Sequence, residues 1–271
     1  MTPPKKATGN IIRFNCSRSF IQKVYHLSMK RVQILGVPID PVSLEEAVSR
    51  IMSMVNDGAK HHVMTPNSEM LIEAHGNVPF KTLLRSGELN IPDSAGLLFA
   101  ATVTSQDLPE RVAGVDVVEK LCSTIGSDHP VFFLGGRSGV GRRASEALQK
   151  KNPRLVVAGV HEGSPSDADA SEIIKKINGS GAHILFVAYG APAQDLWINQ
   201  YLMNLVPVKV AMGIGGSFDF LAGSIKRAPK WMRSARLEWL WRLVLEPRRI
   251  GRIFRAVIVF PIYILRYGRG G

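Results

Sequence analysis

The sequence predicts an α/β fold in which helices flank a parallel β-sheet, followed by a basic helical appendage. Two observations predict the sheet and one predicts the appendage. From residue 32 to residue 212, short apolar runs alternate with stretches of helical periodicity. Most runs have four to six residues and little polar alternation, which is typical of strands buried on both faces of a parallel sheet. After residue 223 these runs stop, and tryptophan and arginine accumulate.

The positive charge of the chain is concentrated at its two ends. The 271 residues include 34 Lys+Arg and 22 Asp+Glu, for a formal net charge of +12. Residues 1–30 hold six basic and no acidic residues, residues 224–271 hold twelve basic and two acidic ones, and the middle is mildly acidic. We therefore predict a disordered basic extension over 1–30, an α/β core over 31–223 and a basic amphipathic helical appendage over 224–271. A hydrophobic content of 45% excludes a mainly disordered chain.

The first half of the core contains three predicted strands. An apolar strand is expected over 32–37, and Ser43 with Glu46 forms a capping box that starts a helix. The apolar positions of that helix follow the helical period at Ala47, Val48, Ile51 and Val55. The next predicted strands are 62–64 and 89–92, and the next predicted helices are 69–73, one from about 95, and 115–125.

The second half of the core repeats the alternation of strand and helix more clearly. Strands are predicted over 131–134, 155–160, 184–188 and 208–212, with helices over 142–150, 168–177 and 194–204. In open parallel sheets, ligands bind beyond the carboxyl ends of the strands. The residues that follow these strands are therefore the first candidates for a site.

Polar side chains follow the early strands. Thr65 and Asn67 follow one predicted strand and Asp93 follows the next, while Arg111 precedes a glycine and a helix start. A carboxylate such as Asp93 can take a proton from a hydroxyl, and Arg111 can neutralise a phosphate. Spacing alone favours simpler roles, with Asn67 and Asp93 as helix N-caps and Arg111 as a surface residue.

Glycine-rich loops follow three later strands. Such loops let backbone N–H groups approach a phosphate, and several of them on one sheet edge favour a nucleotide cleft. The alternative is that they are tight turns between strand and helix. The loop over 135–141 matches neither the dinucleotide fingerprint nor a Walker loop. The candidates for phosphate binding are Gly135, Gly136, Gly190, Gly215, Gly216 and Asp219.

Signals for metals and disulfides are weak. Cys16 and Cys122 are too few for a disulfide framework and lack the spacing of a thiolate metal site, which favours a reducing compartment. Asp167-x-Asp169 resembles a metal-binding D-x-D motif, but it stands at a predicted helix start, where acidic residues are favoured electrostatically. We predict no metal site.

The appendage interleaves basic residues with Trp, Phe and Leu, which is typical of an interfacial helix on an anionic membrane. Pro247 is expected to separate two helices. The apolar run over 256–265 is interrupted by Pro261 and is too short to span a bilayer. An alternative packs Trp239 and Leu243 into the core and leaves the arginines in solvent. Nucleic-acid binding is a third and less favoured interpretation, because the sequence has no helix-turn-helix, zinc or RNA-recognition signature.

In their order along the chain, these motifs resemble the WecG/TagA/CpsF glycosyltransferases over about residues 32–255. Each motif is weak alone, and the ordered combination is specific. The motifs are Thr65-Pro66-Asn67, Asp93 with Gly96, Arg111-x-x-Gly114-x-Asp116, Gly190-x-Pro192-x-Gln194, Gly215-Gly216-x-Phe218-Asp219, Arg227-Ala228-Pro229-Lys230-Trp231, Leu237-Glu238-Trp239 and Glu246-Pro247-x-Arg249.

The resemblance implies a Rossmann-like fold and an inverting, metal-independent transfer of a hexosyl residue, of N-acetylmannosamine or glucose type, from a UDP-sugar. The implied acceptor is a polyprenyl-diphosphate-linked sugar, used in cell-surface polysaccharide biosynthesis at the cytoplasmic face of the membrane. No cofactor beyond the UDP-sugar substrate is implied, and a homo-oligomer is left open. The alternative is a non-catalytic UDP-sugar- or phosphate-binding regulator at the membrane.

The resemblance also assigns roles to residues. Asp93 matches the general base of the family, and Thr65 and Asn67 match pocket residues near it. Arg111 and Gln194 match further active-site positions. Appendage arginines are expected at the acceptor diphosphate, and the candidates are Arg242, Arg249 and Arg252.

Three positions depart from the family pattern. Ser94 stands where the family usually has glycine, which predicts a restricted turn at Asp93. Ala193 and Asp195 flank Gln194 in place of the usual lysine and glutamate. These departures leave the reaction class unchanged and leave the donor sugar open.

Overall fold

The computed structural model describes residues 30–235 and 237–270. From Arg31 on, the described residues form one compact unit. The basic extension predicted over 1–30 lies outside the described residues except for Lys30. The domain boundaries predicted at residues 30 and 223 stay predictions.

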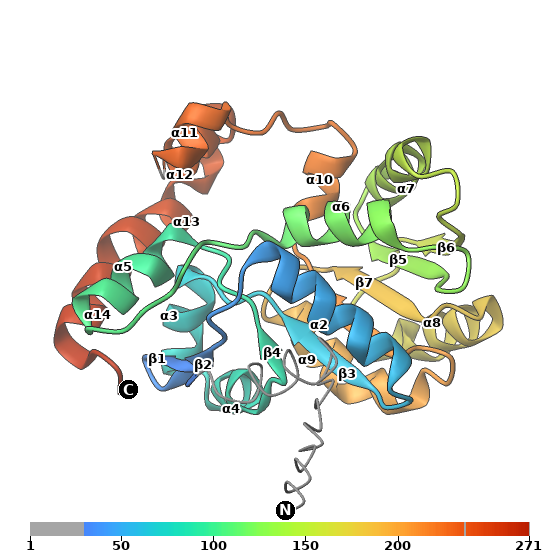
Figure 1. Ribbon diagram of the computed structural model, residues 1–271, viewed down its shortest axis with the longest axis horizontal. Coiled ribbons are helices and arrows are strands. Elements are labelled where there is room, and N and C mark those ends of the chain that lie inside the picture. Colours follow the sequence, from blue (N-terminus) through green and yellow to red (C-terminus); the bar gives the residue numbers. More distant parts are fainter. Residues whose placement is uncertain (1–29, 236, 271) are drawn as a thin grey trace, which may run out of the picture. The chain divides into compact units, whose positions relative to one another are not determined.

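A parallel sheet of six strands forms the centre of the described fold, with the order β4-β3-β8-β7-β5-β6 (Figure 1). This arrangement confirms the predicted parallel sheet. Every strand ends within a few residues of its predicted position. The strands are β3 (His61–Met64), β4 (Leu89–Asn90), β5 (Val131–Gly135), β6 (Val157–His161), β7 (Ile184–Ala188) and β8 (Val210–Gly213).

Helices cover both faces of this sheet, as its almost wholly apolar strands require (Figure 1). Alternate strand residues point to opposite faces, so Phe133 and Phe186 pack with one helix group and Leu134 and Val187 with the other. The first group comprises α2 (Leu44–Asn56), α6 (Gly114–Thr124) and α7 (Val140–Lys151). The second comprises α8 (Asp167–Ser180) and α9 (Ala193–Tyr201).

Helix α2 confirms the most specific local prediction. Ser43 accepts a hydrogen bond from the backbone N–H of Glu46, and the Glu46 carboxylate accepts one from the backbone of Ser43. This capping box satisfies two N–H groups that the helix itself leaves unpaired. The four apolar positions expected to face the core are all buried, namely Ala47, Val48, Ile51 and Val55.

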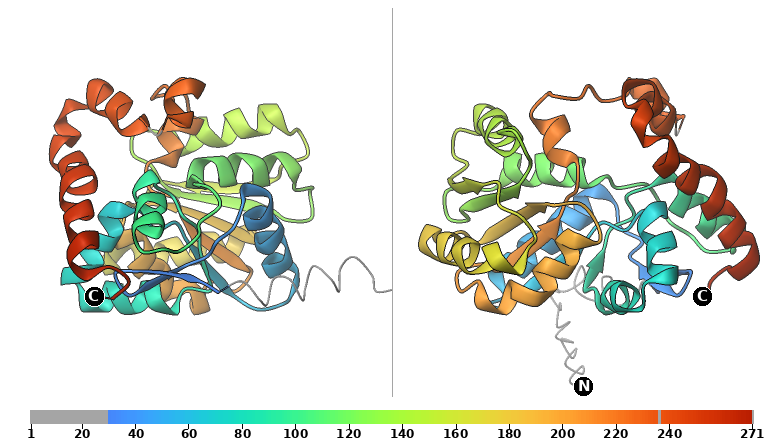
Figure 2. Two further views of the ribbon diagram at one scale, coloured as in Figure 1. Left: turned by 60° about the vertical axis from the view of Figure 1, so that its left-hand side comes forward. Right: turned by 180° about the vertical axis from the view of Figure 1, so that it is seen from behind.

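A further hydrophobic cluster lies beside the sheet and includes the end of the chain. Phe260 and Ile264 of α14 (Phe260–Tyr267) are 0% and 1% exposed within it. Figure 2 shows the C-terminal helices running alongside α3 and α5. The last helix therefore contributes to the core of the protein. Its partners in the cluster are α3 (Ser68–Gly76), α4 (Val78–Ser86), α5 (Ala95–Val103), β1 (Val32–Ile34) and β2 (Val37–Ile39).

The single strand predicted over 32–37 is wrong, because these residues form the start of a β-hairpin. Strands β1 and β2 pair antiparallel, and Leu35 and Gly36 make the turn with φ of 50° and 75°. Positive φ at both turn residues matches the twist of a tight hairpin. The N–H groups of Leu35 and Gly36 donate to the carbonyls of Gly268 and Arg269, so the C-terminal tail pairs with the turn.

Helix α4, which begins directly after α3, is not among the helices predicted from the sequence. Asn77 ends α3 and also caps α4, because its side chain accepts a hydrogen bond from the backbone N–H of Phe80. Pro79 lies in the first turn, where a missing N–H costs the helix nothing. Asparagine and proline, which are typical of loops, here start a helix.

The C-terminal region is helical, as predicted. Helices α11 (Lys230–Ser234) and α12 (Glu238–Leu245) precede a 3₁₀ turn over Pro247–Arg249, so the helix break expected at Pro247 is confirmed. Helix α13 (Ile250–Phe254) then continues through a π-helical turn (Arg255–Val259) into α14. Within the described ranges, no helix is both long enough and apolar enough to cross a membrane.

Candidate active site

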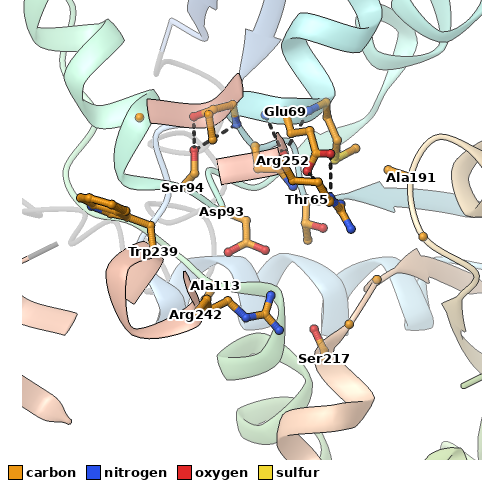
Figure 3. A pocket seen from close by; sticks show the side chains of 18 of the residues that line it. Thr65, Glu69, Asp93, Ser94, Ala113, Ala191, Ser217, Trp239, Arg242 and Arg252 are labelled. Carbon is orange, nitrogen blue, oxygen red and sulfur yellow. Dashed lines mark hydrogen bonds and ion pairs between the residues drawn. The ribbon is translucent and has the colours of Figure 1, made fainter. Parts of the chain in front are cut away.

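A cavity of about 380 Å³ opens beyond the carboxyl ends of β3, β4, β7 and β8, and the C-terminal helices line its other side (Figure 3). Its size falls in the range of small-molecule sites. Most of the residues predicted for catalysis or binding line this cavity, although they come from distant parts of the chain. They are Thr65, Asn67, Asp93, Arg111, Gly190, Gln194, Gly215, Gly216, Arg242, Arg249 and Arg252.

Asp93 points into the cavity (Figure 3). The capping role that spacing alone favoured for it is wrong, because the N-cap of α5 is Ser94. The Asp93 carboxylate accepts a hydrogen bond from the backbone N–H of Gly114 and lies 3.7 Å from Nη2 of Arg111. Burial raises the pKa of Asp93 to about 6, although Arg111 and the Gly114 N–H act in the opposite direction. A carboxylate with such a pKa is charged at neutral pH and can still accept a proton from a hydroxyl.

Ser94 does not restrict the turn at Asp93, contrary to the expectation from the family pattern. Its φ of −149° is ordinary extended backbone. Its hydroxyl accepts a hydrogen bond from the backbone N–H of Ser68 at 3.2 Å and pairs with the Ser68 hydroxyl at 3.0 Å. The steric demand for glycine falls on Gly96 instead, where a Cβ would stand 2.1 Å from Oγ of Ser68.

Thr65 and Asn67 shape the loop after β3. The Thr65 hydroxyl donates to the carbonyl of Gly213 at 3.0 Å, which ties the ends of β3 and β8 together. The Asn67 side chain accepts hydrogen bonds from the backbone N–H groups of Glu69 and Met70, both at 3.0 Å. The N-cap role that spacing favoured for Asn67 is therefore confirmed. Both residues also line the cavity.

Gln194 joins the glycine-rich loops that follow β7 and β8. Its side-chain oxygen accepts a hydrogen bond from the N–H of Gly190 at 3.1 Å and another from the N–H of Gly215 at 2.9 Å. The side chain is almost fully buried beneath the loops. At Gly213, a Cβ would stand 2.6 Å from Nε2 of Gln194, so a larger residue there would displace the amide. The geometry gives Gln194 a positioning role for both loops.

Arg111 is not the surface residue that spacing favoured. Its side chain is 27% exposed, and its Nη1 lies 2.5 Å from a carboxylate oxygen of Glu238 at the start of α12. Burial disfavours its charged form, but Asp93 and Glu238 offset this and hold the pKa of Arg111 above its ordinary range. Glu238 lines the cavity but is not among the site residues predicted from the sequence, although its motif Leu237-Glu238-Trp239 was a signal.

The three candidate arginines of the appendage line the cavity but differ in their bonding partners. Arg252 makes a forked ion pair with Glu69, at 2.7 Å and 2.8 Å, and Arg249 donates to Glu246 at 2.7 Å. Arg242 stacks on Phe220, with 4.4 Å from its guanidinium carbon to the ring centre. Burial, together with the charge of Arg249, lowers the pKa of Arg242.

Arg242 is the least satisfied of the three. Two of its nitrogens, Nε and Nη2, are buried and have no hydrogen-bond partner among the described residues. A carboxylate oxygen of Glu246 lies 3.5 Å from Nε. Buried donors without partners are rare in folded proteins and often mark a place where a ligand completes the bonding. Trp239, one turn earlier, also lines the cavity and is 36% exposed, so the alternative that packs Trp239 into the core is wrong.

Gly135, Gly136 and Asp219 are not among the residues that line the cavity. A Cβ at Gly135 would stand 2.9 Å from the Ala188 backbone, so glycine is needed there for close packing. The Glu162 carboxylate accepts a hydrogen bond from the N–H of Gly139 and takes the position that a phosphate would need. The tight-turn interpretation therefore describes this loop better, and its role in donor binding stays a prediction.

Asp219 lies beside Gly216, a residue that lines the cavity. Its carboxylate oxygen is 3.7 Å from the position that a Cβ of Gly216 would take. Burial and the charge of Glu246 raise the pKa of Asp219, while Arg242 and Arg249 act against them. It belongs to the charged surroundings of these arginines, and a direct contact with the donor stays a prediction.

The D-x-D motif occupies the first turn of α8, as its alternative interpretation expected. Asp167 accepts hydrogen bonds from Tyr201 at 2.6 Å and from Gln200 at 3.3 Å. Among the described residues, no group of three or more His, Cys, Asp or Glu side chains has an arrangement that could hold a metal ion. The expectation that no metal is used stays a prediction.

Comparison with known proteins identifies the family. The sequence model of the glycosyl transferase WecG/TagA/CpsF family matches residues 32–271. The chain belongs to this family of glycosyltransferases. The match also covers residues 256–271, which the resemblance in the sequence left out, so the helix α14 that completes the core is part of the family domain.

Three curated relatives share one name, N-acetylglucosaminyldiphosphoundecaprenol N-acetyl-beta-D-mannosaminyltransferase. The protein of Bacillus spizizenii is 32% identical, over 77% of this chain and 78% of the relative. The protein of Staphylococcus aureus is 28% identical, over 88% of this chain and 94% of the relative. The protein of Bacillus subtilis is 29% identical, over 80% of this chain and 86% of the relative.

Proposed function

We propose that this glycosyltransferase moves a hexosyl residue of N-acetylmannosamine type from a UDP-sugar to a polyprenyl-diphosphate-linked sugar, with inversion and without a metal ion. The observation that carries the proposal is that Asp93 and Arg242 line the same cavity (Figure 3). Asp93 is a carboxylate with a raised pKa, and Arg242 is a cation with unpartnered N–H groups. The names of the three relatives support the choice of acceptor and donor sugar.

The proposed reaction is a single displacement at the anomeric carbon of the donor. The acceptor hydroxyl oxygen forms a bond to that carbon, its proton passes to Asp93, and the bond from the carbon to the UDP oxygen breaks. UDP leaves with the electron pair, so negative charge develops on its diphosphate. Arginines and backbone N–H groups stabilise that charge where a metal ion does so in other enzymes.

The two diphosphates have distinct proposed positions. The loops around Gly190 and Gly215, which Gln194 holds in place, line the cavity beyond β7 and β8 and suit the donor. Arg249 and Arg252 lie on the side formed by the C-terminal helices and suit the acceptor diphosphate. Arg242, whose Nη2 lies 3.8 Å from the position that a Cβ of Gly216 would take, lies beside the donor loop. A role in cell-surface polysaccharide biosynthesis follows from such an acceptor.

We also propose that the C-terminal helices rest on the inner, anionic face of the cell membrane. Large apolar side chains recur along α13, the π-helical turn and α14 at intervals of three or four residues, which places them on one stripe. Basic residues such as Arg248 and Arg266 accompany them. The combination suits a lipid surface that also holds the polyprenyl acceptor. The stripe comprises Ile250, Phe254, Ile258, Ile262 and Leu265, which are between 46% and 73% exposed.

A panel of donors tests the proposed function. UDP-N-acetylmannosamine, UDP-glucose, UDP-N-acetylglucosamine and UDP-uronic acids are each incubated with a short-chain lipid-diphosphate N-acetylglucosamine, and UDP release is measured. We expect release with UDP-N-acetylmannosamine that depends on the acceptor. Donor binding without release for every donor would support the alternative of a non-catalytic UDP-sugar-binding regulator.

A further inference from the structure

We propose that Glu238 is a positioning residue, which holds Arg111 away from Asp93 so that Asp93 stays available as the proton acceptor. The inference rests on the proposed function, because it assumes that Asp93 is the general base. It adds a residue from the C-terminal helices to the proton-transfer machinery. Two carboxylates, those of Asp93 and Glu238, lie close to the one guanidinium of Arg111.

Arg111 lies between Asp93 and Glu238 but bonds only one of them. Its Nη1 donates to Oε2 of Glu238 at 2.5 Å, whereas its Nη2 is 3.7 Å from Oδ1 of Asp93. The first distance is that of a charge-assisted hydrogen bond, and the second is too long for any hydrogen bond. Arg111 is therefore hydrogen-bonded to Glu238 and not to Asp93. The side chain of Glu238 is only 11% exposed.

This arrangement has a chemical consequence for Asp93. An arginine bonded directly to a carboxylate occupies its lone pairs and favours its charged form, which weakens it as a base. At 3.7 Å, Arg111 still stabilises the charge on Asp93 but leaves its oxygens open to the cavity. The negative charge of Glu238 also raises the pKa of Asp93.

Glu238 is itself held in place from its other side. Its second oxygen lies 3.8 Å from Nε of Arg227, and Arg227 makes a forked ion pair with Asp116 on α6. Asp116 stands two residues after Gly114, whose N–H bonds Asp93. Five alternating charges thus join the start of α12 to the loop that carries Asp93.

The test is the pH profile of the Glu238→Gln variant. Glutamine keeps the shape of the side chain but loses the charge that captures Arg111, so Arg111 is expected to move onto Asp93. We expect the acidic limb of the kcat profile to move down by about one pH unit and the plateau kcat to fall about 3- to 10-fold, as Brønsted behaviour requires of a weaker base. Glu238→Asp, which retains the charge on a shorter side chain, is expected to give an intermediate limb and covers the case in which Glu238→Gln does not fold.

Two further variants separate this role from a structural one. Glu119→Gln removes an exposed carboxylate of α6 that pairs with Lys151, and it should leave the profile unchanged. In the Arg111→Ala background, adding Glu238→Gln should lower the limb clearly less than it does in the parent, because only the direct effect of the Glu238 charge on Asp93 then remains. A limb that stays at the parent value in both Glu238 variants overturns the inference. Near-normal turnover of Asp93→Asn would instead contradict the role of Asp93 as the base, and with it the proposed mechanism. Failure of the proposed function and failure of the inference about Glu238 therefore give different results.

Discussion

At the residue scale, the environment that suits Asp93 to its proposed role as a base has a cost in stability. Its pKa rises from 3.8 to about 6 because folding buries the carboxylate and brings the carboxylates of Glu238 and Asp116 near it. The charged form is therefore less favourable in the folded state than in the unfolded one. The same surroundings place a proton acceptor at the cavity wall that is effective near neutral pH.

Replacing Asp93 with asparagine should separate these two effects. We expect Asp93→Asn to fold and to lower turnover at least ~10²-fold, the scale of a lost general base. UDP release measures the loss, and a thermal melt checks the fold. Turnover within a few-fold of the parent would rule out the role of base.

The raised pKa also predicts the pH dependence of the activity. Because protonated Asp93 cannot accept a proton, kcat/KM should decrease as the pH falls through about 6. The sign for stability is opposite to that of an ordinary buried ion pair. Below pH 3.8 Asp93 is protonated in both states and carries no penalty, and as the pH rises through about 6 the penalty becomes complete. An acidic limb near pH 4 in a steady-state profile would contradict the assignment.

At the element scale, the C-terminal helix has an inner and an outer side. Phe260 is fully buried against α3 and α5, whereas Phe254, six residues earlier, is 56% exposed. The stripe of exposed residues is therefore backed by residues that anchor the helix. The pairing of the C-terminal tail with the β1–β2 turn adds a second attachment.

Two matched substitutions test this division. Phe260→Ala should lower the free energy of unfolding by about 3–5 kcal/mol, because it leaves a cavity in a closed core. Phe254→Ala should change it by less than about 0.5 kcal/mol, because the side chain is exposed. Denaturant unfolding measures both changes: the midpoint concentration should shift, while the slope of the unfolding free energy against denaturant concentration stays the same. Equal effects would mean that the helix does not pack as described.

The elements also show where sequence patterns mislead. The helical period of α2 and the apolar runs of the sheet predicted these elements, because their burial depends on local spacing. The β1–β2 hairpin was read as one strand because Leu35, a residue that rarely adopts positive φ, makes its turn. The carbonyls of Gly268 and Arg269 that pair with this turn come from the far end of the chain.

For the whole molecule, the net charge of +12 comes partly from basic residues of the C-terminal region, which lie in two different environments. Several appendage arginines turn inward, where Arg242, Arg249 and Arg252 line the cavity. Others lie with the exposed apolar stripe on α13 and α14. One basic segment therefore faces two anionic partners in the proposed function, a diphosphate and a membrane surface.

Membrane docking can be tested with substitutions on the stripe alone. The double variant Phe254→Glu and Ile258→Glu should lower sedimentation with vesicles of 30% phosphatidylglycerol at least about tenfold, since it replaces apolar contacts with charges that anionic lipid repels. Val206→Glu, an exposed apolar residue just before β8, is the matched control and should bind as the parent does. Unchanged sedimentation of the double variant would contradict the proposed surface.

The candidate site could be predicted from the sequence only in part. The positions of Asp93, Thr65 and Arg111, after strands or before a helix, made them candidates for a site. The resemblance to the family then assigned their chemical roles. Spacing alone favoured a cap for Asp93 and solvent for Arg111, and both interpretations were wrong. Glu238 was missed because its contact with Arg111 joins residues 127 positions apart.

By itself the sequence determined the parallel sheet, most of its helices, the capping box and the family, since these depend on local periodicity and on ordered motifs. Only the tertiary structure decided which charges meet. It brought Arg111 between two carboxylates, joined the loops of Gly190 and Gly215 through Gln194, and buried Phe260 in the core. The physical reason is that burial and charge pairing depend on distance in space, and residues far apart in the sequence supply both.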